Sequence, residues 1–292
     1  MGEGTIIKAL SGFYTVADGS HRITCKAKGR FRHVSTSPLV GDHVTYSLQP
    51  DATGTIDAIA PRKNSFIRPA VANIDAMVYI AGAAKPVTDP FLIDRFSVIA
   101  RHADCEMIVC LNKCDLVSAD ELFDIYSRSG FPTVCTSAAT GEGIETLRRL
   151  IHGKICAFAG NSGIGKSSIL NCLVPDLALK TDEISEKLGR GKHTTRHVEF
   201  FPLDDTTFVA DTPGFASFEV QMVDDIEAEQ LQFCFPDFEP YFGSCRFQDC
   251  RHLNEPDCAI SGAVRTGALA PTRYESYKRL YDLIKTQSRN NY

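Results

Sequence analysis

The sequence lacks any apolar run of the length that crosses a bilayer. No uninterrupted apolar stretch approaches the roughly 20 residues that a transmembrane helix needs. The first residues, Met1-Gly2-Glu3, also lack the charged and apolar regions that open a secretory signal peptide. From these two absences we expect a cytoplasmic protein that does not associate with a membrane.

An excess of basic residues is missing as well. The formal net charge is −5, which argues against a protein that coats nucleic acid along its whole length. Residues 1–67 nevertheless hold eight Lys and Arg against five Asp and Glu, so the amino-terminal segment is the basic part of the chain. The 11 cysteines are odd in number and scattered, which favours a reducing compartment over a secreted disulfide framework.

A length of 292 residues exceeds the ~250 residues at which single cores usually stop growing, so we expect several domains. Residues 1–67 contain short β-prone runs at 12–16, 21–25 and 42–46, separated by turn signals such as Asp18-Gly19. This spacing is typical of a small all-β barrel of the OB type. From Asn73 onward strands alternate with helices, which predicts a parallel α/β sheet in a central domain at residues 68–218.

Four cations in the first domain alternate with uncharged residues. A strand would place them all on one face, where they suit a phosphodiester backbone; they are Lys26, Lys28, Arg30 and Arg32. The alternative is an ordinary solvated strand face or a basic loop.

The stretch Gly160-Asn161-Ser162-Gly163-Ile164-Gly165-Lys166-Ser167 follows the apolar run 155–159 and precedes a helix-like run that begins with Ser168. Strand, glycine-rich turn and helix are the context of a phosphate-binding P-loop. Backbone N–H groups would surround a polyphosphate, Lys166 would supply a cation for the β- and γ-phosphates, and the Ser167 hydroxyl would ligate Mg²⁺. The competing interpretation is a glycine-rich turn with an incidental lysine.

A buried strand at 106–111 runs into Asn112-Lys113-Cys114-Asp115, an NKxD tetrad. The Asp115 carboxylate can accept hydrogen bonds from N1–H and the 2-amino group of guanine, whereas adenine has no matching donor pair. Asn and Asp are also common turn formers at strand ends, so the tetrad gains its weight from the nearby P-loop. The turn at Ser137 and Ala138 would present backbone N–H groups to the guanine O6.

Two further segments complete a guanine-nucleotide set. The glycine-rich loop 189–196 contains Thr194 and Thr195, either of which can reach Mg²⁺ and the γ-phosphate, unless the loop is simply solvated. The sequence Asp211-Thr212-Pro213-Gly214 is a DxxG motif, in which Asp211 would hold Mg²⁺ through water and the Gly214 N–H would meet the γ-phosphate. In Ras-like GTPases the P-loop comes first, whereas here NKxD precedes it, which indicates a circular permutation.

The third segment, 219–292, contains three cysteines and one histidine in the spacing C-x4-C-x-H-x5-C: Cys245, Cys250, His252 and Cys258. Three thiolates and one imidazole are a complete ligand set for a structural Zn²⁺ site. Buried thiols without a metal are the alternative. We expect a mostly helical zinc-binding domain, closed by a helix whose Tyr274, Tyr277 and Tyr281 pack inward.

Together these motifs make the chain resemble the bacterial ribosome small-subunit-dependent GTPases, which are circularly permuted GTPases with an amino-terminal OB fold and a carboxy-terminal zinc domain. The resemblance covers nearly the whole chain. It implies GTP and GDP, Mg²⁺ and Zn²⁺ as ligands, and binding of a monomer to the small (30S) subunit and its 16S rRNA late in assembly. Arg196 stands where many relatives carry a third threonine, so Thr194 and Thr195 both remain candidates, with Thr195 assigned to magnesium and catalysis.

The water-positioning group of a Ras-like GTPase is missing. Phe215 occupies the place of the glutamine that follows the DxxG glycine, and a phenyl ring cannot orient water. We expect the isolated protein to hydrolyse GTP slowly. His193 is the candidate that replaces the glutamine, and Lys166 and Thr195 are the other candidate catalytic residues. The alternative for His193 is a surface histidine. The preferred function is a subunit-stimulated GTPase. The first alternative is a nucleotide-gated RNA-binding protein in which hydrolysis is incidental. The second is a GTPase attached to RNA modification or metabolite chemistry.

Overall fold

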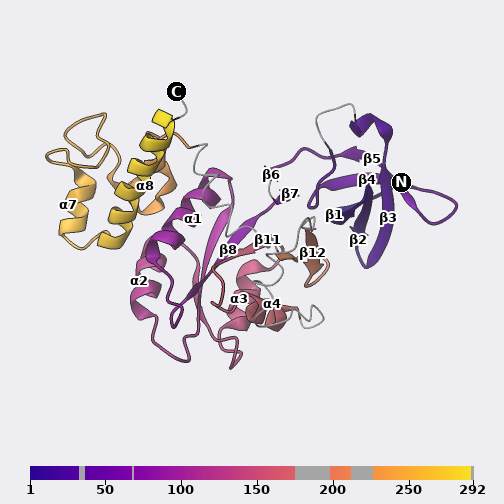
Figure 1. Ribbon diagram of the computed structural model, residues 1–292, viewed down its shortest axis with the longest axis horizontal. Coiled ribbons are helices and arrows are strands. Elements are labelled where there is room, and N and C mark those ends of the chain that lie inside the picture. Colours follow the sequence, from indigo (N-terminus) through magenta and orange to yellow (C-terminus); the bar gives the residue numbers. More distant parts are fainter. Residues whose placement is uncertain (33–36, 68, 175–197, 212–225, 291–292) are drawn as a thin grey trace.

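Figure 1 shows the computed structural model of the chain, which describes residues 1–32, 37–67, 69–174, 198–211 and 226–290. The basic amino-terminal barrel, a central α/β unit and the carboxy-terminal helices follow one another along its longest axis. Within the described residues, no helix combines the length and hydrophobicity that a membrane crossing requires.

The first unit is a five-stranded barrel, as the alternating pattern predicts. Its strands are β1 (Gly2–Leu10), β2 (Phe13–Asp18), β3 (His21–Ala27), β4 (His43–Leu48) and β5 (Gly54–Ile59). β1, β2 and β3 pair antiparallel, β3 runs parallel to β5, and β4 pairs with both β5 and β1 to close the barrel. Inward-facing apolar side chains such as Ile6, Val16 and Ile56 are fully buried.

The predicted strand of alternating cations is wrong. β3 ends at Ala27, and Gly29–Arg32 form the short 3₁₀ helix η1 instead. The Phe31 N–H donates to the Lys28 carbonyl at 3.1 Å, which turns the chain out of the sheet, and Lys28 forms an ion pair with Asp57 at 2.6 Å. The four cations therefore do not share one strand face.

The central unit is a parallel sheet with helices on both faces. Its strands run in the order β10 (Thr133–Thr136), β9 (Glu106–Asn112), β8 (Ala76–Gly82), β11 (Ile155–Ala159) and β13 (Phe208–Asp211), all parallel. Residues of α1 (Pro90–His102) and α2 (Asp120–Arg128) pack in one core cluster, and those of α3 (Ile144–Ile151) and α4 (Lys166–Leu173) in another. Asp89 caps α1 by accepting from the Phe91 N–H at 3.0 Å.

The barrel and the central sheet share one hydrogen-bonded array. β12 (Glu199–Pro202) pairs antiparallel with β13 on one side and with β1 on the other, where Lys8 lies opposite Glu199. The two side chains form an ion pair at 2.8 Å. A small hairpin of β6 (Ser65–Ile67) and β7 (Ala70–Ala72) lies where the barrel leads into the central unit.

The carboxy-terminal unit consists of η3 (Leu231–Cys234), η4 (Pro236–Tyr241), α7 (Ala259–Arg265) and α8 (Pro271–Asn290). α8 packs beside α1 (Figure 1) and, as predicted, buries Tyr274, Tyr277 and Tyr281.

A fully buried arginine joins the last unit to the central one. Arg273 on α8 pairs with Asp94 of α1 at 2.8 Å and with Asp237 of η4 at 2.6 Å. Its guanidinium also lies over the Phe235 ring, 4.6 Å from the centroid. Because a buried cation needs compensating charge, this triad fixes how α8 docks against α1.

Candidate functional site

The predicted nucleotide motifs gather at one edge of the central sheet. NKxD follows β9, the turn at Ser137 and Ala138 follows β10, the P-loop follows β11, and Asp211 ends β13. Because these strands are parallel, their carboxyl ends meet at the same edge, where α/β proteins bind ligands. The chain order of the motifs is rotated, yet the sheet brings them together.

Asn112 ties three of these loops to one another. Its side-chain amide donates to the Ile164 carbonyl in the P-loop at 2.8 Å, and its side-chain oxygen accepts from the Ala138 N–H at 3.2 Å. The side chain is 2% exposed. Asn112 therefore holds the P-loop and the Ser137–Ala138 turn next to the end of β9.

Lys113 holds the NKxD loop against the P-loop. Its backbone adopts the left-handed region, with φ 68°, and its ammonium donates to the Gly163 carbonyl at 2.8 Å and to the Lys85 carbonyl at 2.6 Å. Left-handed non-glycine residues often occur at functional sites. The sequence reasoning missed the segment around Lys85, because nothing in its residue types signals a contact with Lys113.

Asp115 is exposed at the end of this loop, so its carboxylate is accessible to a base. Ser137 and Ala138 lie in a tight turn in which the Thr140 N–H donates to the Ser137 hydroxyl at 3.2 Å. The Cys114 N–H donates to the Thr136 carbonyl at 3.1 Å, which joins the NKxD loop to the start of this turn. The structure thus brings together the acceptor and the backbone turn that the sequence predicted.

Two P-loop glycines adopt conformations that a side chain would not tolerate. Gly165 has φ +93°, and a Cβ there would come within 2.4 Å of the Asn112 amide nitrogen. Gly160 has φ +146°, and its Cβ would come within 2.5 Å of the Ile80 carbonyl. These glycines let the loop pass close to the sheet edge.

Lys166, Ser167 and Ser168 form the first turn of α4, with Asn161, Ser162 and Gly163 in the loop before it. The unsatisfied N–H groups of a helix N-terminus attract phosphate, and α4 carries no acidic residue in its first turn to oppose it. Asp211 lies opposite Phe158 of β11, next to this turn. His193, Thr194, Thr195 and Gly214 lie outside the described residues.

The four predicted metal ligands converge in the carboxy-terminal unit. The ligand atoms of Cys245, Cys250, His252 and Cys258 all lie within 4.8 Å of one another. His252 Nδ1 is 3.5 Å from the sulfur of Cys245 and 3.5 Å from that of Cys258, and these two sulfurs are 4.0 Å apart. Tetrahedral Zn²⁺ with bonds of about 2.3 Å to sulfur and about 2.0 Å to nitrogen sets ligand atoms at about these separations.

The electrostatics of the cluster also fit a metal. Burial lowers the pKa of His252, which favours the neutral imidazole that a metal requires. His252 Nε2 lies 2.9 Å from the side-chain oxygen of Gln232, so the second ring nitrogen has an orienting partner. Burial raises the pKa of the Cys250 thiol to about 12, and a divalent cation would offset that cost by binding the thiolate.

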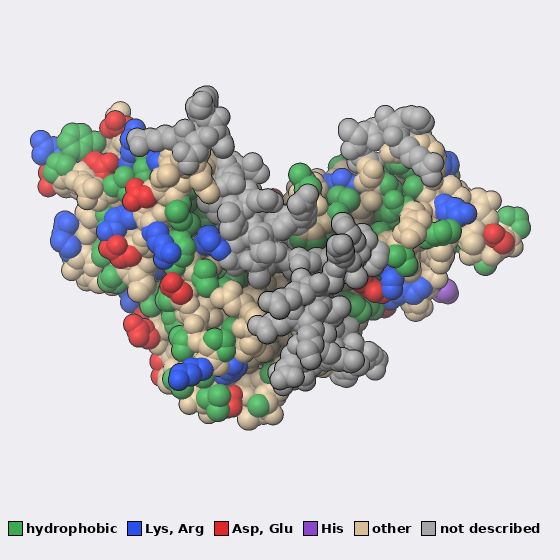
Figure 2. All heavy atoms as spheres, in the orientation of Figure 1, with side chains coloured by type: hydrophobic (Ala, Val, Ile, Leu, Met, Phe, Trp, Pro, Cys, Tyr) green, Lys and Arg blue, Asp and Glu red, His purple; other side chains and the backbone are tan. Residues whose placement is uncertain are grey.

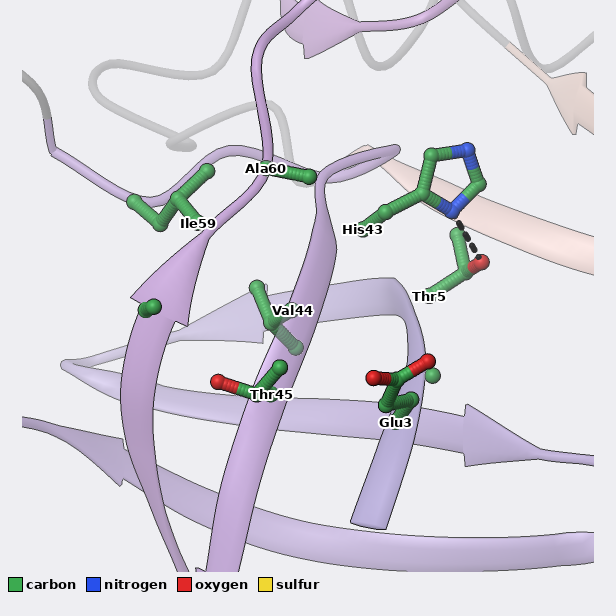
Figure 3. Close-up of a pocket in the computed structure, with 9 residues that line it drawn as sticks. Glu3, Thr5, His43, Val44, Thr45, Ile59 and Ala60 are labelled. Atoms are coloured by element: carbon green, nitrogen blue, oxygen red, sulfur yellow. Dashed lines mark hydrogen bonds between the residues drawn. The ribbon is translucent and has the colours of Figure 1, made fainter.

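A separate cavity of about 450 Å³ lies on the barrel, shown in Figure 3. Its walls come from β1, β4 and the end of β5, and Thr5 Oγ1 lies 3.0 Å from His43 Nδ1. No nucleotide-motif residue among those that the structure describes lines it.

Comparison with known proteins agrees with this geometry. The sequence model of the RsgA GTPase matches residues 59–221, and that of the RsgA N-terminal domain matches residues 3–56. A relative from Caldanaerobacter subterraneus subsp. tengcongensis, named small ribosomal subunit biogenesis GTPase RsgA, is 43% identical over 293 residues, covering 99% of this chain and 98% of its own. A relative of the same name from Bacillus pumilus is 44% identical over 296 residues, covering 98% of each chain.

Solved structures give the same result. The crystal structure of YjeQ from Thermotoga maritima aligns with a TM-score of 0.83 at 37% identity, covering 97% of this chain and 98% of that one. YloQ, described as a circularly permuted GTPase, aligns with a TM-score of 0.80 at 37% identity, covering 98% and 96%. With the rotated motif order and the shared sheet edge, these matches show that the chain belongs to the RsgA family of circularly permuted GTPases.

Proposed function

We propose that this GTPase binds the small (30S) ribosomal subunit late in its maturation and hydrolyses GTP to GDP and phosphate when the subunit stimulates it. The observation that carries the proposal is full-length similarity to relatives named small ribosomal subunit biogenesis GTPases. The nucleotide site described above supplies the chemistry.

Asp115 is the guanine reader in this proposal, with the Ser137–Ala138 turn at O6 and Asn112 and Lys113 holding both loops in place. The P-loop from Gly160 to Ser167, with Ser168, surrounds the phosphates. Lys166 neutralises charge on the β- and γ-phosphates.

Magnesium supplies a charge that polarises the phosphates when it is bound. The Ser167 hydroxyl at the start of α4 would hold it, together with Thr195 or Thr194 and, through water, Asp211. Gly214 would donate its N–H to the γ-phosphate. Support comes from the position of Ser167 at the start of α4, which follows β11 along the chain, and of Asp211 at the end of β13, which pairs with β11.

The carboxy-terminal cluster binds Zn²⁺ in this proposal and stabilises a unit with few helices of its own. The three domains are assigned to residues 1–67, 68–218 and 219–292. The extents of the two family matches, 3–56 and 59–221, support these boundaries.

Contact with 16S rRNA is assigned to the basic barrel of a monomeric, cytoplasmic protein. Lys26 lies over the exposed ring of Phe13, 4.9 Å from its centroid, and such cation and aromatic pairs suit stacked bases. On the face shown in Figure 2, Lys and Arg are interspersed with Asp and Glu over the helical units, which favours a local RNA contact over a whole-surface one.

The experiment that tests this function is GTP turnover with and without purified small subunits. The proposal expects slow turnover alone and strong stimulation by the subunit. Turnover that the subunit leaves unchanged would favour the second candidate, a nucleotide-gated RNA-binding protein.

Replacing His193 with Ala tests the group that substitutes for the missing glutamine. We expect subunit-stimulated hydrolysis to fall to the unstimulated rate, while GTP affinity stays the same, because the histidine would act on water and not on the bound nucleotide. His152→Ala, an exposed histidine at the end of α3, is the matched control. Stimulation that survives in the His193 variant would contradict the assignment.

A further inference from the structure

Two thiols lie side by side behind the proposed guanine reader. Cys114 is the third residue of the NKxD tetrad, and Cys135 lies on β10 just before the Ser137–Ala138 turn. Leu111 is the strand neighbour of Cys135, and the Cys114 sulfur lies 3.2 Å from the Leu111 carbonyl. The Cys114 N–H donates to the Thr136 carbonyl at 3.1 Å, so the two cysteines are held on adjacent segments.

Both side chains point to the same face of the sheet, since both pack against the core cluster that includes α1 and α2. The two thiols are near enough for Cys114 to contribute to the raised pKa of Cys135. Both are only partly buried, so small molecules in solvent can reach them.

The other cysteines differ from this pair. Five are buried and lie outside the metal cluster: Cys25, Cys105, Cys110, Cys156 and Cys234. Three are the proposed zinc ligands. Cys172 is partly exposed, but its sulfur is directed to the Ala138 carbonyl at 3.6 Å.

We propose that Cys114 and Cys135 are a redox modification site: they form a reversible disulfide that weakens guanine nucleotide binding. The effect on binding rests on the proposed role of Asp115, whereas formation of the disulfide does not.

The oxidant is a hydroperoxide such as hydrogen peroxide. The Cys114 sulfur attacks one peroxide oxygen, the O–O bond breaks, and the products are a sulfenic acid and water. The Cys135 sulfur then displaces the hydroxyl from the sulfenic sulfur, which forms the S–S bond and releases a second water. Two thiols lose two electrons, and one peroxide gains them. Burial raises the pKa of Cys135 to about 12, which disfavours this thiol as the first to attack the peroxide.

Bond formation would displace the loop that carries Asp115. The two sulfurs must approach to about 2.05 Å when they are oxidised, and Cys114 stands directly between Lys113 and Asp115. Lys113 is already in the left-handed region and tied to two carbonyls, so the strand end has little freedom to absorb the shift. Loss of the charged hydrogen bonds to guanine corresponds to about tenfold to hundredfold weaker binding.

The test uses the full-length zinc-loaded protein, reduced and then treated with hydrogen peroxide. A fluorescent GDP analogue measures affinity, and non-reducing peptide mapping by mass spectrometry detects the Cys114–Cys135 disulfide. The proposal expects that disulfide, weaker GDP binding by about tenfold or more, and recovery with dithiothreitol.

Variants separate this site from the zinc cluster. Cys135→Ser should keep its reduced-state GDP affinity after peroxide treatment, while Cys172→Ser should still lose affinity. A chromogenic chelator follows zinc release in each sample. Two outcomes would overturn the proposal that the disulfide weakens nucleotide binding. One is that Cys135→Ser loses as much GDP affinity as the natural chain, and the other is that the disulfide forms without changing GDP affinity. A reduced protein with no preference for guanine over adenine nucleotides would instead overturn the assignment of Asp115, although peptide mapping would still decide whether the disulfide forms.

Discussion

At the scale of single residues, Asn112 and Asp115 differ in a way that the NKxD pattern does not reveal. Asn112 is buried and bonded to two loops, whereas Asp115 is exposed and available to a ligand. Spacing alone predicted that both belong to the nucleotide site. It could not show that Asn112 supports the loops while Asp115 stays exposed, because that depends on contacts of Asn112 with residues 26 and 52 positions away.

Replacing Asp115 with Asn should change the preferred base. An amide donates where the carboxylate accepted, so it opposes the 2-amino group of guanine and matches the 2-carbonyl of xanthine. We expect GTP affinity to fall on the order of a hundredfold and xanthosine triphosphate to bind more tightly than GTP. Equilibrium binding measures both, with Asp120→Asn as the control. Unchanged GTP affinity would contradict the role of Asp115.

Asp204 stabilises the turn between β12 and β13 in a pH-dependent way. Burial opposes its ionisation, but the N–H groups and hydroxyls of Thr206 and Thr207 donate to it at 2.8 to 3.0 Å and hold its pKa below the ordinary value. A depressed pKa in the folded state stabilises the fold above the unfolded-state pKa of about 3.9 and loses that contribution as the pH falls.

Asp204→Asn should therefore lower the melting temperature at neutral pH and have a smaller effect near pH 3.5. The carboxylate is 43% exposed, so solvent screening limits the contribution to about 1 kcal/mol or less. Thermal unfolding at both pH values measures the difference. Asp205→Asn, which makes the same change of charge at an exposed neighbour, is the control; equal behaviour of the two variants would refute the assignment.

At the scale of elements, local periodicity predicted most helices and strands of the central unit. α1 and α3 follow apolar spacing that is visible in the sequence, and Pro90 begins its helix as expected. The stripe from Lys26 to Arg32 failed because an alternating pattern does not reveal the turn at Lys28. β12 was missed because it is four residues long and owes its position to pairing with β1.

Gln232 of η3 orients the histidine of the metal cluster from a neighbouring element. Gln232→Ala removes the partner of His252 Nε2 but none of the ligands. We expect zinc affinity about 10-fold to 100-fold weaker, since the imidazole loses its fixed orientation. Competition with a chelator of known affinity measures it, and the exposed Gln230 provides a matched alanine control. Equal affinities in the two variants would show that Gln232 does not orient the ligand.

At the scale of the whole molecule, the buried arginine triad sets the position of the carboxy-terminal unit. No sequence pattern predicted it, because Asp94, Asp237 and Arg273 come from three distant segments and each resembles an ordinary surface charge. The motifs and the predicted parallel strands together indicated the sheet edge at which the motifs gather. The docking of one unit on another depends on long-range pairs that spacing does not encode.

Arg273→Met should destabilise the protein by about 3–5 kcal/mol, because it leaves two carboxylates buried without a cation. Urea unfolding measures the change. Arg279→Met, an exposed position on the same helix with its guanidinium over the Phe91 ring, should cost about 1 kcal/mol or less. If both variants unfold alike, the triad does not hold the two units together.

The strand β12 connects the nucleotide edge of the central sheet to the barrel. Along the chain it follows the loop with the two candidate threonines, and β13 after it ends at Asp211 of the DxxG motif, so the hairpin is flanked by both segments expected to sense the γ-phosphate. Its outer edge is bonded to β1 through Lys8 and Glu199. Because β12 is hydrogen-bonded to β13 along one edge and to β1 along the other, a displacement at either end of this hairpin would be passed directly to a strand of the barrel.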